Sequence, residues 1–301
     1  MRTRPIVPLL LAAAASSAST LGAQGDGRTQ AQLLRRAYSS PSSASQQAAE
    51  KEREYFVYLP QGYESEKGKL WPVILFLHGG GERGNGKSDL EKTLAHGPLM
   101  EAWVKGRDLP FILIGPQLYT MPRDPNAASP APRPAVALSP PPISRAMAGE
   151  KPRWAAEGPP LGWWTVENDL LAMVDATLNE FRGDPDRVYL TGLSYGGYGT
   201  WYMAGLHAAR WAAVAPVCGA SDPKAIPLIA AAKLPIWIVQ GGKDRVVRPE
   251  YVTQSAMDLE KAGHPAVRFT VHEDMAHNVW SRVYEGWDLY AWLLQHRRRR
   301  D

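Results

Sequence analysis

The sequence predicts an α/β fold, in which a mostly parallel sheet is flanked by helices on both faces. Short apolar runs typical of buried strands recur along the chain, and segments with apolar residues at helical spacing separate them. This alternation is the pattern of parallel strands joined by helical crossovers. The 301 residues, 45% of them hydrophobic, are enough for one sizeable core.

The individual elements follow from these runs. Strands are expected at 54–59, 73–77, 111–115, 187–191, 213–217, 236–239 and 267–271. Helices are expected at 89–104, 166–178, 198–206, 249–262 and 279–295, the first of them broken at Gly97-Pro98.

The two ends of the chain differ from this pattern. Residues 1–23 are interpreted as a signal peptide, because Arg2 and Arg4 precede a short apolar stretch and small residues. That stretch is too short to span a membrane, so no integral membrane segment is expected after its removal. A Ser-, Ala- and Gln-rich linker at 24–53, a domain at 54–296 and a solvated basic tail at 297–301 complete the expected organisation. The leader predicts a secreted or periplasmic protein.

A proline-rich insertion is expected at 116–162. The stretch 115–162 holds 12 of the 26 prolines and few large apolar residues, so it cannot build a core of its own. It begins where a parallel strand ends, which is the ligand side of an open α/β sheet. This position and composition are consistent with a lid or rim loop, and equally with an insertion that has no role.

Composition excludes several function classes. The net charge of +4 comes from the two ends, and the body between them is close to neutral, so no nucleic-acid-binding face is expected. Cys218 is the one cysteine, which excludes an intramolecular disulfide, and its apolar surroundings indicate a buried side chain. No zinc-spaced Cys/His cluster and no phosphate-binding glycine loop is present, so no metal or cofactor is expected.

The pentapeptide 192–196, Gly-Leu-Ser-Tyr-Gly, carries the strongest chemical signal. It lies between a predicted strand and a predicted helix, which is the context of a nucleophile elbow. Such a turn exposes Ser194 above the sheet, and glycines flank it because a Cβ would crowd the neighbouring elements.

A second glycine turn, His78-Gly79-Gly80-Gly81, directly follows the predicted strand 73–77. Backbone N–H groups in such a turn can stabilise an oxyanion. The expected donors are Tyr195, Gly80 and Gly81, whereas His78 is expected to be a hydrogen-bonded structural residue.

A carboxylate and an imidazole complete the set. Asp244 follows the strand 236–239, and His277 follows the strand 267–271. An imidazole can take a proton from serine near neutral pH, and a carboxylate can orient it. Asp222 is the rival for the acid. The order Ser194, Asp244, His277 is typical of an α/β-hydrolase triad.

These residues resemble secreted α/β-hydrolases of the esterase and "predicted peptidase" group, which includes dienelactone-hydrolase-like and polyhydroxybutyrate-depolymerase-like esterases. The matching motifs are Leu-His-Gly-Gly-Gly-Glu-Arg-Gly at 77–84, Thr-Gly-Leu-Ser-Tyr-Gly-Gly-Tyr-Gly-Thr-Trp at 191–201, Val-Ala-Pro-Val-Cys-Gly at 214–219, Gly-Gly-Lys-Asp at 241–244 and Ala-His at 276–277. The resemblance implies the α/β-hydrolase fold and a triad of Ser194, Asp244 and His277. The chain departs from the group in the insertion.

The expected function is that of a secreted serine hydrolase, carboxylesterase-like (EC 3.1.1), which cleaves small-molecule or polymer-borne esters through an acyl-enzyme. A serine peptidase of the same fold is one alternative, since the same triad cleaves both bonds. A non-catalytic binding protein on this scaffold is another. The oligomeric state stays open.

Overall fold

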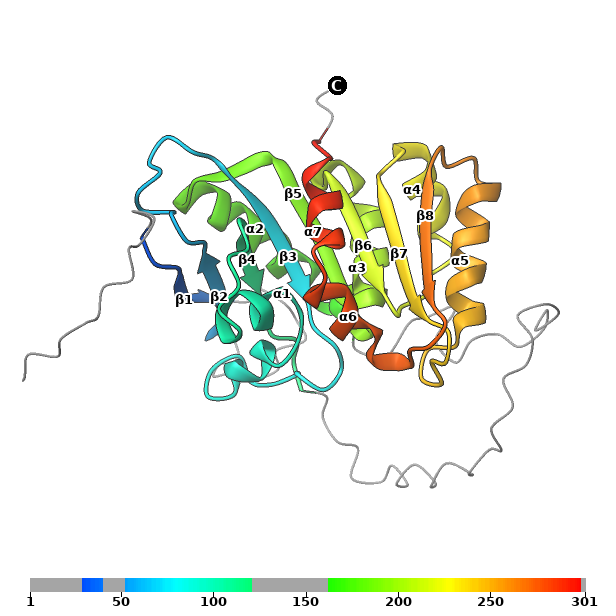
Figure 1. Ribbon diagram of the computed structural model, residues 1–301, viewed down its shortest axis with the longest axis horizontal. Helices are drawn as coiled ribbons and strands as arrows, with labels where there is room; N and C mark the ends of the chain where they lie inside the picture. The colour runs from blue at the N-terminus through cyan, green and yellow to red at the C-terminus, as the bar shows by residue number, and fades with distance from the viewer. Residues whose placement is uncertain (1–28, 40–51, 121–161, 299–301) are drawn as a thin grey trace, which may run out of the picture.

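A computed structural model describes residues 29–39, 52–120 and 162–298 (Figure 1). Eight strands form one sheet in the order β1-β2-β4-β3-β5-β6-β7-β8. The strands are β1 (Gln32–Ser39), β2 (Glu52–Leu59), β3 (Trp71–Leu77), β4 (Ile112–Gly115), β5 (Gly183–Leu193), β6 (Ala213–Val217), β7 (Ile236–Gly241) and β8 (Val267–His272). From β4 to β8 neighbouring strands run parallel, whereas β1 and β2 are antiparallel additions at one edge. The predicted mostly parallel sheet is confirmed.

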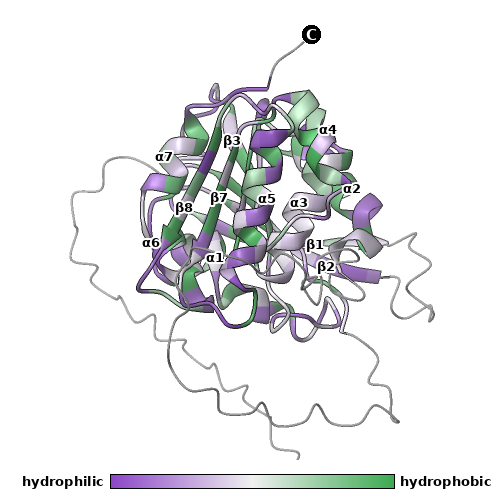
Figure 2. Ribbon diagram, turned by 90° about the vertical axis from the view of Figure 1, so that its right-hand side faces the viewer, coloured by the Kyte–Doolittle hydropathy of each residue, from purple (hydrophilic) through white to green (hydrophobic). Residues whose placement is uncertain are grey.

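Helices cover both faces of this sheet, as predicted (Figure 1). One face carries α2 (Glu167–Glu180), α3 (Tyr195–Leu206), α4 (Ala225–Ala232) and α5 (Pro249–Lys261). The other carries α1 (Gly97–Leu99), α6 (Trp280–Glu285) and α7 (Asp288–Leu294). Figure 2 shows the hydrophobic colouring along the central strands and both polar and apolar residues on α5, as expected of a helix with one face on a sheet.

Strand β3 illustrates how the sheet divides the core. Val73, Leu75 and Leu77 belong to the cluster under α2 and α3, whereas Ile74 and Phe76 belong to the cluster on the opposite face. All five side chains are at most 1% exposed. Because both faces are covered, the strand has no polar alternation, and its continuous apolar run follows from that burial. Each such side chain contributes roughly 1.5–3 kcal/mol of transfer free energy.

The linker predicted at 24–53 contains a strand instead. Strand β1 pairs antiparallel with β2 over its whole length, with Arg35 opposite Phe56. The Ser, Ala and Gln content of 24–53 hid this strand, and its Arg35 and Arg36 are tolerated because an edge strand can carry charges on its outer positions. Arg35 pairs with Glu54 and Glu91. The sheet therefore extends one strand further than predicted.

Two predicted helices are interrupted. In place of the predicted helix 279–295, a 3₁₀ turn at His277–Val279 leads into α6, and α7 follows. The two helices are separate because Gly286, directly after α6, has extended backbone. The segment 89–104 divides as predicted at Gly97, whose φ is +81°. A 3₁₀ turn at Leu90–Leu94 precedes this glycine, and α1 and a π-helical turn at Met100–Val104 follow it. Two further 3₁₀ turns occupy Trp163–Val166 and Ala208–Arg210.

The remaining expectations concern the two ends of the chain, the proline-rich insertion and membrane spans. The signal peptide and nearly all of the insertion lie outside the described residues. The first two residues of the basic tail contact the start of β5, since Arg297 pairs with Asp184 and the Arg298 backbone N–H donates to Asp186. Within the described ranges, no helix combines the length and apolarity that a membrane span requires.

Candidate active site

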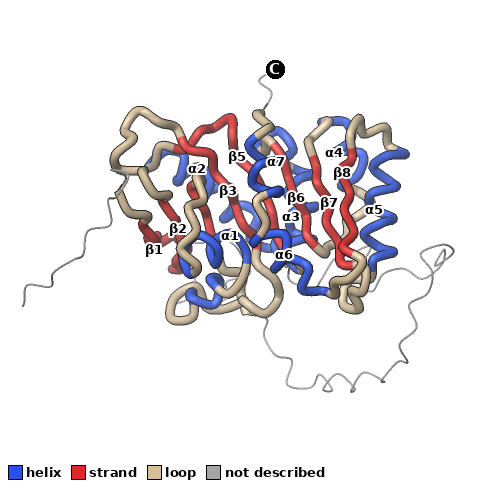
Figure 3. Tube along the Cα trace, in the orientation of Figure 1, coloured by secondary structure: helices blue, strands red, loops and turns tan. Residues whose placement is uncertain are grey.

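The predicted site residues all lie at the carboxyl ends of parallel strands. The glycine turn follows β3, Ser194 follows β5, Asp244 follows β7 and His277 follows β8. Figure 3 shows the loops at this edge in tan, below the red strands. Parallel strands bring their carboxyl ends to one edge, which is where open α/β sheets bind ligands.

Ser194 occupies a strained turn between β5 and α3. Its φ of +53° and ψ of −114° lie outside the regions that non-glycine residues favour. The turn is held because the Ser194 N–H donates to Val217 and the Ser194 carbonyl accepts from Tyr198. Strain of this kind persists only where its surroundings fix it, and it is concentrated at functional sites.

The glycines around Ser194 are required by close packing. A Cβ at Gly196 would overlap the carbonyl oxygen of Leu77, and one at Gly192 would overlap the carbonyl of Gly196. At Gly197 it would lie 2.5 Å from the Val217 carbonyl oxygen. These backbone contacts cannot relax by side-chain rotation, so the sequence expectation for the flanking positions holds.

The structure brings Ser194, His277 and Asp244 into one hydrogen-bonded chain. His277 Nε2 lies 2.9 Å from Ser194 Oγ, and His277 Nδ1 lies 2.7 Å from Asp244 Oδ2. Because a carboxylate can only accept, the Nδ1 proton faces Asp244 and leaves Nε2 free to accept the serine proton. This is the arrangement of an activated hydroxyl nucleophile.

Asp244 is buried and fully engaged. Its Oδ1 accepts the N–H groups of Val246 and Val247 at 2.8 and 3.0 Å, while Oδ2 faces His277 and also accepts from Gln240. Charge-assisted bonds of this kind fix the carboxylate orientation. The rival Asp222 instead accepts the Lys224 N–H at the start of α4, and no interaction joins it to His277 among the described residues.

The glycine turn is fixed by His78, as expected for a structural histidine. Its Nε2 accepts the Leu118 N–H, so the proton of the neutral ring is on Nδ1 and is donated to the Gly79 carbonyl at 2.6 Å. Burial lowers the pKa of His78 to about 3, which keeps the ring neutral. In a trans peptide the Gly80 N–H points opposite to the Gly79 carbonyl, so His78 sets the direction of that N–H.

The predicted oxyanion donors Gly80, Gly81 and Tyr195 belong to the glycine turn and to the start of α3. A Cβ at Gly80 would lie 3.3 Å from the Tyr195 ring, whereas one at Gly81 would meet no described atom within 4 Å. As the first residue of α3, Tyr195 has a backbone N–H that no preceding helical turn can accept. Arg83 stacks over the Tyr195 ring and donates to the Gly80 carbonyl at 3.1 Å.

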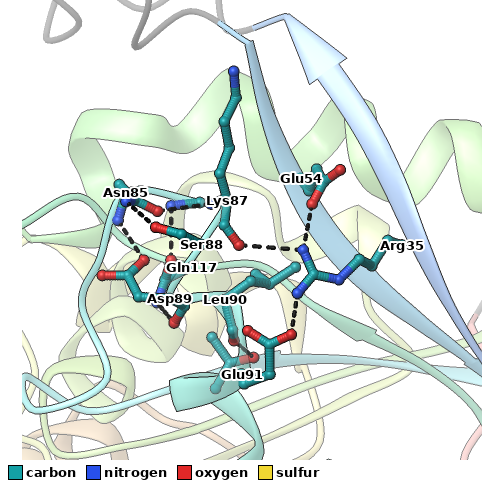
Figure 4. Close-up of polar contacts among 11 residues, drawn as sticks. Arg35, Glu54, Asn85, Lys87, Ser88, Asp89, Leu90, Glu91 and Gln117 are labelled. Atoms are coloured by element: carbon teal, nitrogen blue, oxygen red, sulfur yellow. Dashed lines mark hydrogen bonds and ion pairs between the residues drawn. The ribbon is translucent and has the colours of Figure 1, made fainter.

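Gln117 anchors the loop that follows the glycine turn (Figure 4). Its amide nitrogen donates to the carbonyls of Glu82 and Asp89 at 2.9 and 2.8 Å, and its oxygen accepts the Gly86 N–H at 2.7 Å. The side chain is 3% exposed, so these bonds are shielded from water. One residue at the start of the proline-rich insertion thus fixes the loop beside the site.

Strand β1 supports the same loop from its outer side. Arg35 donates to the Lys87 carbonyl at 3.2 Å and to Glu54 at 2.7 Å, and it also pairs with Glu91 (Figure 4). The strand missing from the sequence prediction therefore carries a contact that holds the loop.

Three residues near Ser194 were not assigned to the site by sequence reasoning: Glu82, His96 and Trp280. The Trp280 ring packs edge-on against the His277 ring, with 5.2 Å between the ring centroids. The His96 ring packs against Trp280 on its other contact, with 5.4 Å between the centroids. Glu82 lies between His96 and the glycine turn. The position of Glu82 beside the glycine turn was a sequence signal for its place here.

Cys218, Asp244 and His277 form a group whose potential metal-binding atoms lie within 4.8 Å of one another. The group fits a metal poorly, because both Asp244 oxygens are engaged and burial, with the nearby Asp244 charge, raises the pKa of the Cys218 thiol well above its usual value. A protonated thiol is a weak metal ligand. That the protein needs no metal or cofactor stays a prediction.

The chain is similar to known hydrolases. The model of the Dienelactone hydrolase family matches residues 145–291, which confirms the resemblance to dienelactone-hydrolase-like esterases. A search of curated protein sequences gave no match.

Solved structures share the α/β-hydrolase fold. A thermostable esterase is 23% identical, with a TM-score of 0.59 over 88% of this chain, and the chain covers 63% of that esterase's length. A ferulic acid esterase from Anaeromyces mucronatus is 17% identical, with a TM-score of 0.55 over 91% of this chain and 93% of that one. The acylaminoacyl peptidase of Pyrococcus horikoshii is 14% identical, with a TM-score of 0.55 over 89% of this chain and 43% of that one. These likenesses show the fold, and the family match supports a hydrolase.

Proposed function

We propose that this protein is a serine hydrolase that cleaves carboxylic esters through an acyl-enzyme. The observation that carries the proposal is the hydrogen-bonded chain from Ser194 through His277 to Asp244. The nucleophile, the base and the orienting carboxylate each stand within reach of the next, which is the geometric requirement for this chemistry.

In the acylation step, Ser194 Oγ attacks the ester carbonyl carbon while His277 Nε2 takes its proton. Asp244 holds the ring and offsets the positive charge that forms on it. The tetrahedral intermediate collapses as His277 gives the proton to the alcohol oxygen, which leaves. In deacylation, water attacks the acyl carbon with His277 again as base, and Ser194 recovers its proton.

The oxyanion is stabilised by the N–H groups of Tyr195 and of the Gly80-Gly81 turn. The support is positional: Tyr195 begins α3, and His78 directs the Gly80 N–H away from itself. A helix N-terminus also carries a partial positive charge, which favours an anion there. One such donor is commonly worth ~3 kcal/mol of transition-state stabilisation.

An ester is proposed over a peptide because two of the similar structures named above are esterases, and the match to the Dienelactone hydrolase family agrees with that choice. The substrate is a small-molecule or polymer-borne ester. The leader-like residues 1–23 support export, so we propose a secreted or periplasmic enzyme. Peptide hydrolysis stays the second candidate, because the same fold occurs in the acylaminoacyl peptidase.

The test compares three substrates side by side: a short-chain aryl ester, a feruloyl ester and a peptidyl anilide. The Ser194→Ala variant serves as the blank, and its thermal unfolding is measured beside the wild type. Ester turnover should fall by at least about 10⁴-fold in the variant, because the nucleophile is lost and the fold is kept.

Undiminished turnover in Ser194→Ala would refute the mechanism. Dominant anilide turnover would assign the protein to the peptidases. If the folded wild type turned over none of a wider panel of esters and anilides, the result would favour the non-catalytic binding protein.

A further inference from the structure

Glu82 is a buried carboxylate with an unused oxygen. The residue is 8% exposed, and its Oε2 has no hydrogen-bond partner among the described residues. A buried polar atom without a partner is unfavourable, and exceptions call for a specific explanation. A group that enters from outside would satisfy this oxygen.

The unused oxygen lies beside the nucleophile. A methyl group added at Gly79 would be 3.2 Å from Glu82 Oε2 and 3.7 Å from Ser194 Cβ. The histidine on its inner side cannot serve it, because His78 Nδ1 is 3.7 Å away and donates to the Gly79 carbonyl. The carboxylate and the serine therefore flank the same glycine of the turn.

A chain of side-chain contacts also connects Glu82 to the proposed base, His277. His96 Nε2 lies 3.5 Å from Glu82 Oε1, His96 packs on Trp280, and Trp280 packs on His277. His277 is the group that gives its proton to the departing alcohol. These contacts link Glu82, through His96 and Trp280, to the group that protonates the departing alcohol.

We propose that Glu82, together with His96 and Trp280, forms a subsite for the alcohol portion of the ester and selects alcohols that carry further hydroxyl groups. A hydroxyl next to the ester bond would donate to Glu82 Oε2, while the Trp280 ring packs against the C–H groups of the same polyol. This inference rests on the proposed esterase function and adds the class of its leaving group.

The experiment compares two esters with the same acyl group and similar length, 1-monobutyrin and propyl butyrate. Wild-type kcat/KM should favour 1-monobutyrin by roughly 10-fold, the scale of one hydrogen bond to a charged group. In Glu82→Met, which keeps the side-chain length and removes both acceptor oxygens, the ratio should fall to about 1. A purely structural role would lower both rates equally and leave the ratio unchanged, which would overturn the proposal.

A second measurement uses the unaltered protein and so does not depend on how a variant folds. With an aryl butyrate as acyl donor, glycerol and 1-propanol compete with water for the acyl-enzyme. The alcohol oxygen attacks the acyl carbon, His277 takes its proton, and Ser194 Oγ leaves and recovers that proton. Glycerol should capture the acyl group roughly 10-fold better than 1-propanol, because transfer to alcohol reverses the leaving step.

The remaining outcomes separate the two proposals. Ser194-dependent cleavage of propyl butyrate with no preference for the glycerol ester would overturn the subsite and leave the esterase function standing. A preference for butyrylcholine over both esters, lost in Glu82→Met, would overturn the hydroxyl class in favour of a cation. Absence of Ser194-dependent cleavage of any ester would overturn both proposals together.

Discussion

Two buried carboxylates stand near one serine, and they differ in their partners. Asp244 has both oxygens engaged, by two backbone N–H groups, His277 and Gln240. Glu82 has one oxygen 3.5 Å from His96 and the other without a partner among the described residues.

This contrast separates an internal from an external role. A carboxylate whose oxygens are all satisfied by the protein is held in one orientation, which suits a residue that orients a base. A carboxylate with an unsatisfied oxygen at the rim of a site has bonding capacity left for a ligand. Removing Asp244 should therefore reduce turnover of every substrate, whereas removing Glu82 should change which substrate is preferred.

The largest loss of activity is expected when Asp244, the carboxylate with both oxygens engaged, is replaced. Asp244→Asn should lower kcat by about 10⁴-fold, because the amide favours the wrong tautomer of His277. Asp222→Asn is the matched control and should stay within about twofold, since surface substitutions away from a site have little effect. Steady-state kinetics on one aryl ester measures both. A larger loss in Asp222→Asn would move the acid to that residue.

A smaller effect is expected from the glycine turn beside Glu82. His78→Leu should lower kcat by about 10²-fold with little change in KM, because the Gly79 carbonyl loses its donor and the Gly80 N–H loses its fixed direction. His78→Asn should keep more activity, since its amide N–H can replace the Nδ1 donor. Equal kinetics for the two variants would contradict this role.

The same histidine gives the smallest predicted effect, on stability. Its pKa is about 3 in the folded protein against 6.5 for an exposed imidazole. Between these values the unfolded chain binds the proton and the folded one does not, so the free energy of unfolding falls as pH drops from 6.5 toward 3. The slope from this one group is at most about 1.4 kcal/mol per pH unit.

Urea unfolding at pH 7, 6 and 5 measures this slope. His78→Asn removes the titrating ring, so its stability should depend less steeply on pH over that range. Parallel curves for the variant and the wild type would show that His78 does not carry the dependence.

The sequence could predict those parts of the fold that depend on local patterns. Continuous apolar runs located the central strands, because strands covered on both faces have no polar positions. The order of Ser194, Asp244 and His277 predicted that they would meet, and the structure places them within hydrogen-bonding distance. Their catalytic roles stay predictions.

Features that depend on pairing at a distance could not be predicted in this way. Strand β1 is stabilised by β2 and by the charges on Glu54 and Glu91, none of which is visible in its own residues. Glu82 stands out because its oxygen lacks a partner, which is a property of the folded surroundings alone.

Cys218 provides a built-in reporter for this site. It is the one cysteine in the chain, it is fully buried, and its sulfur lies in the same group as the Asp244 carboxylate and the His277 ring. Alkylating reagents attack the thiolate, which the raised pKa of this thiol makes scarce in the folded state. The rate of alkylation therefore measures how often the layer behind the triad opens, without the need to introduce a probe.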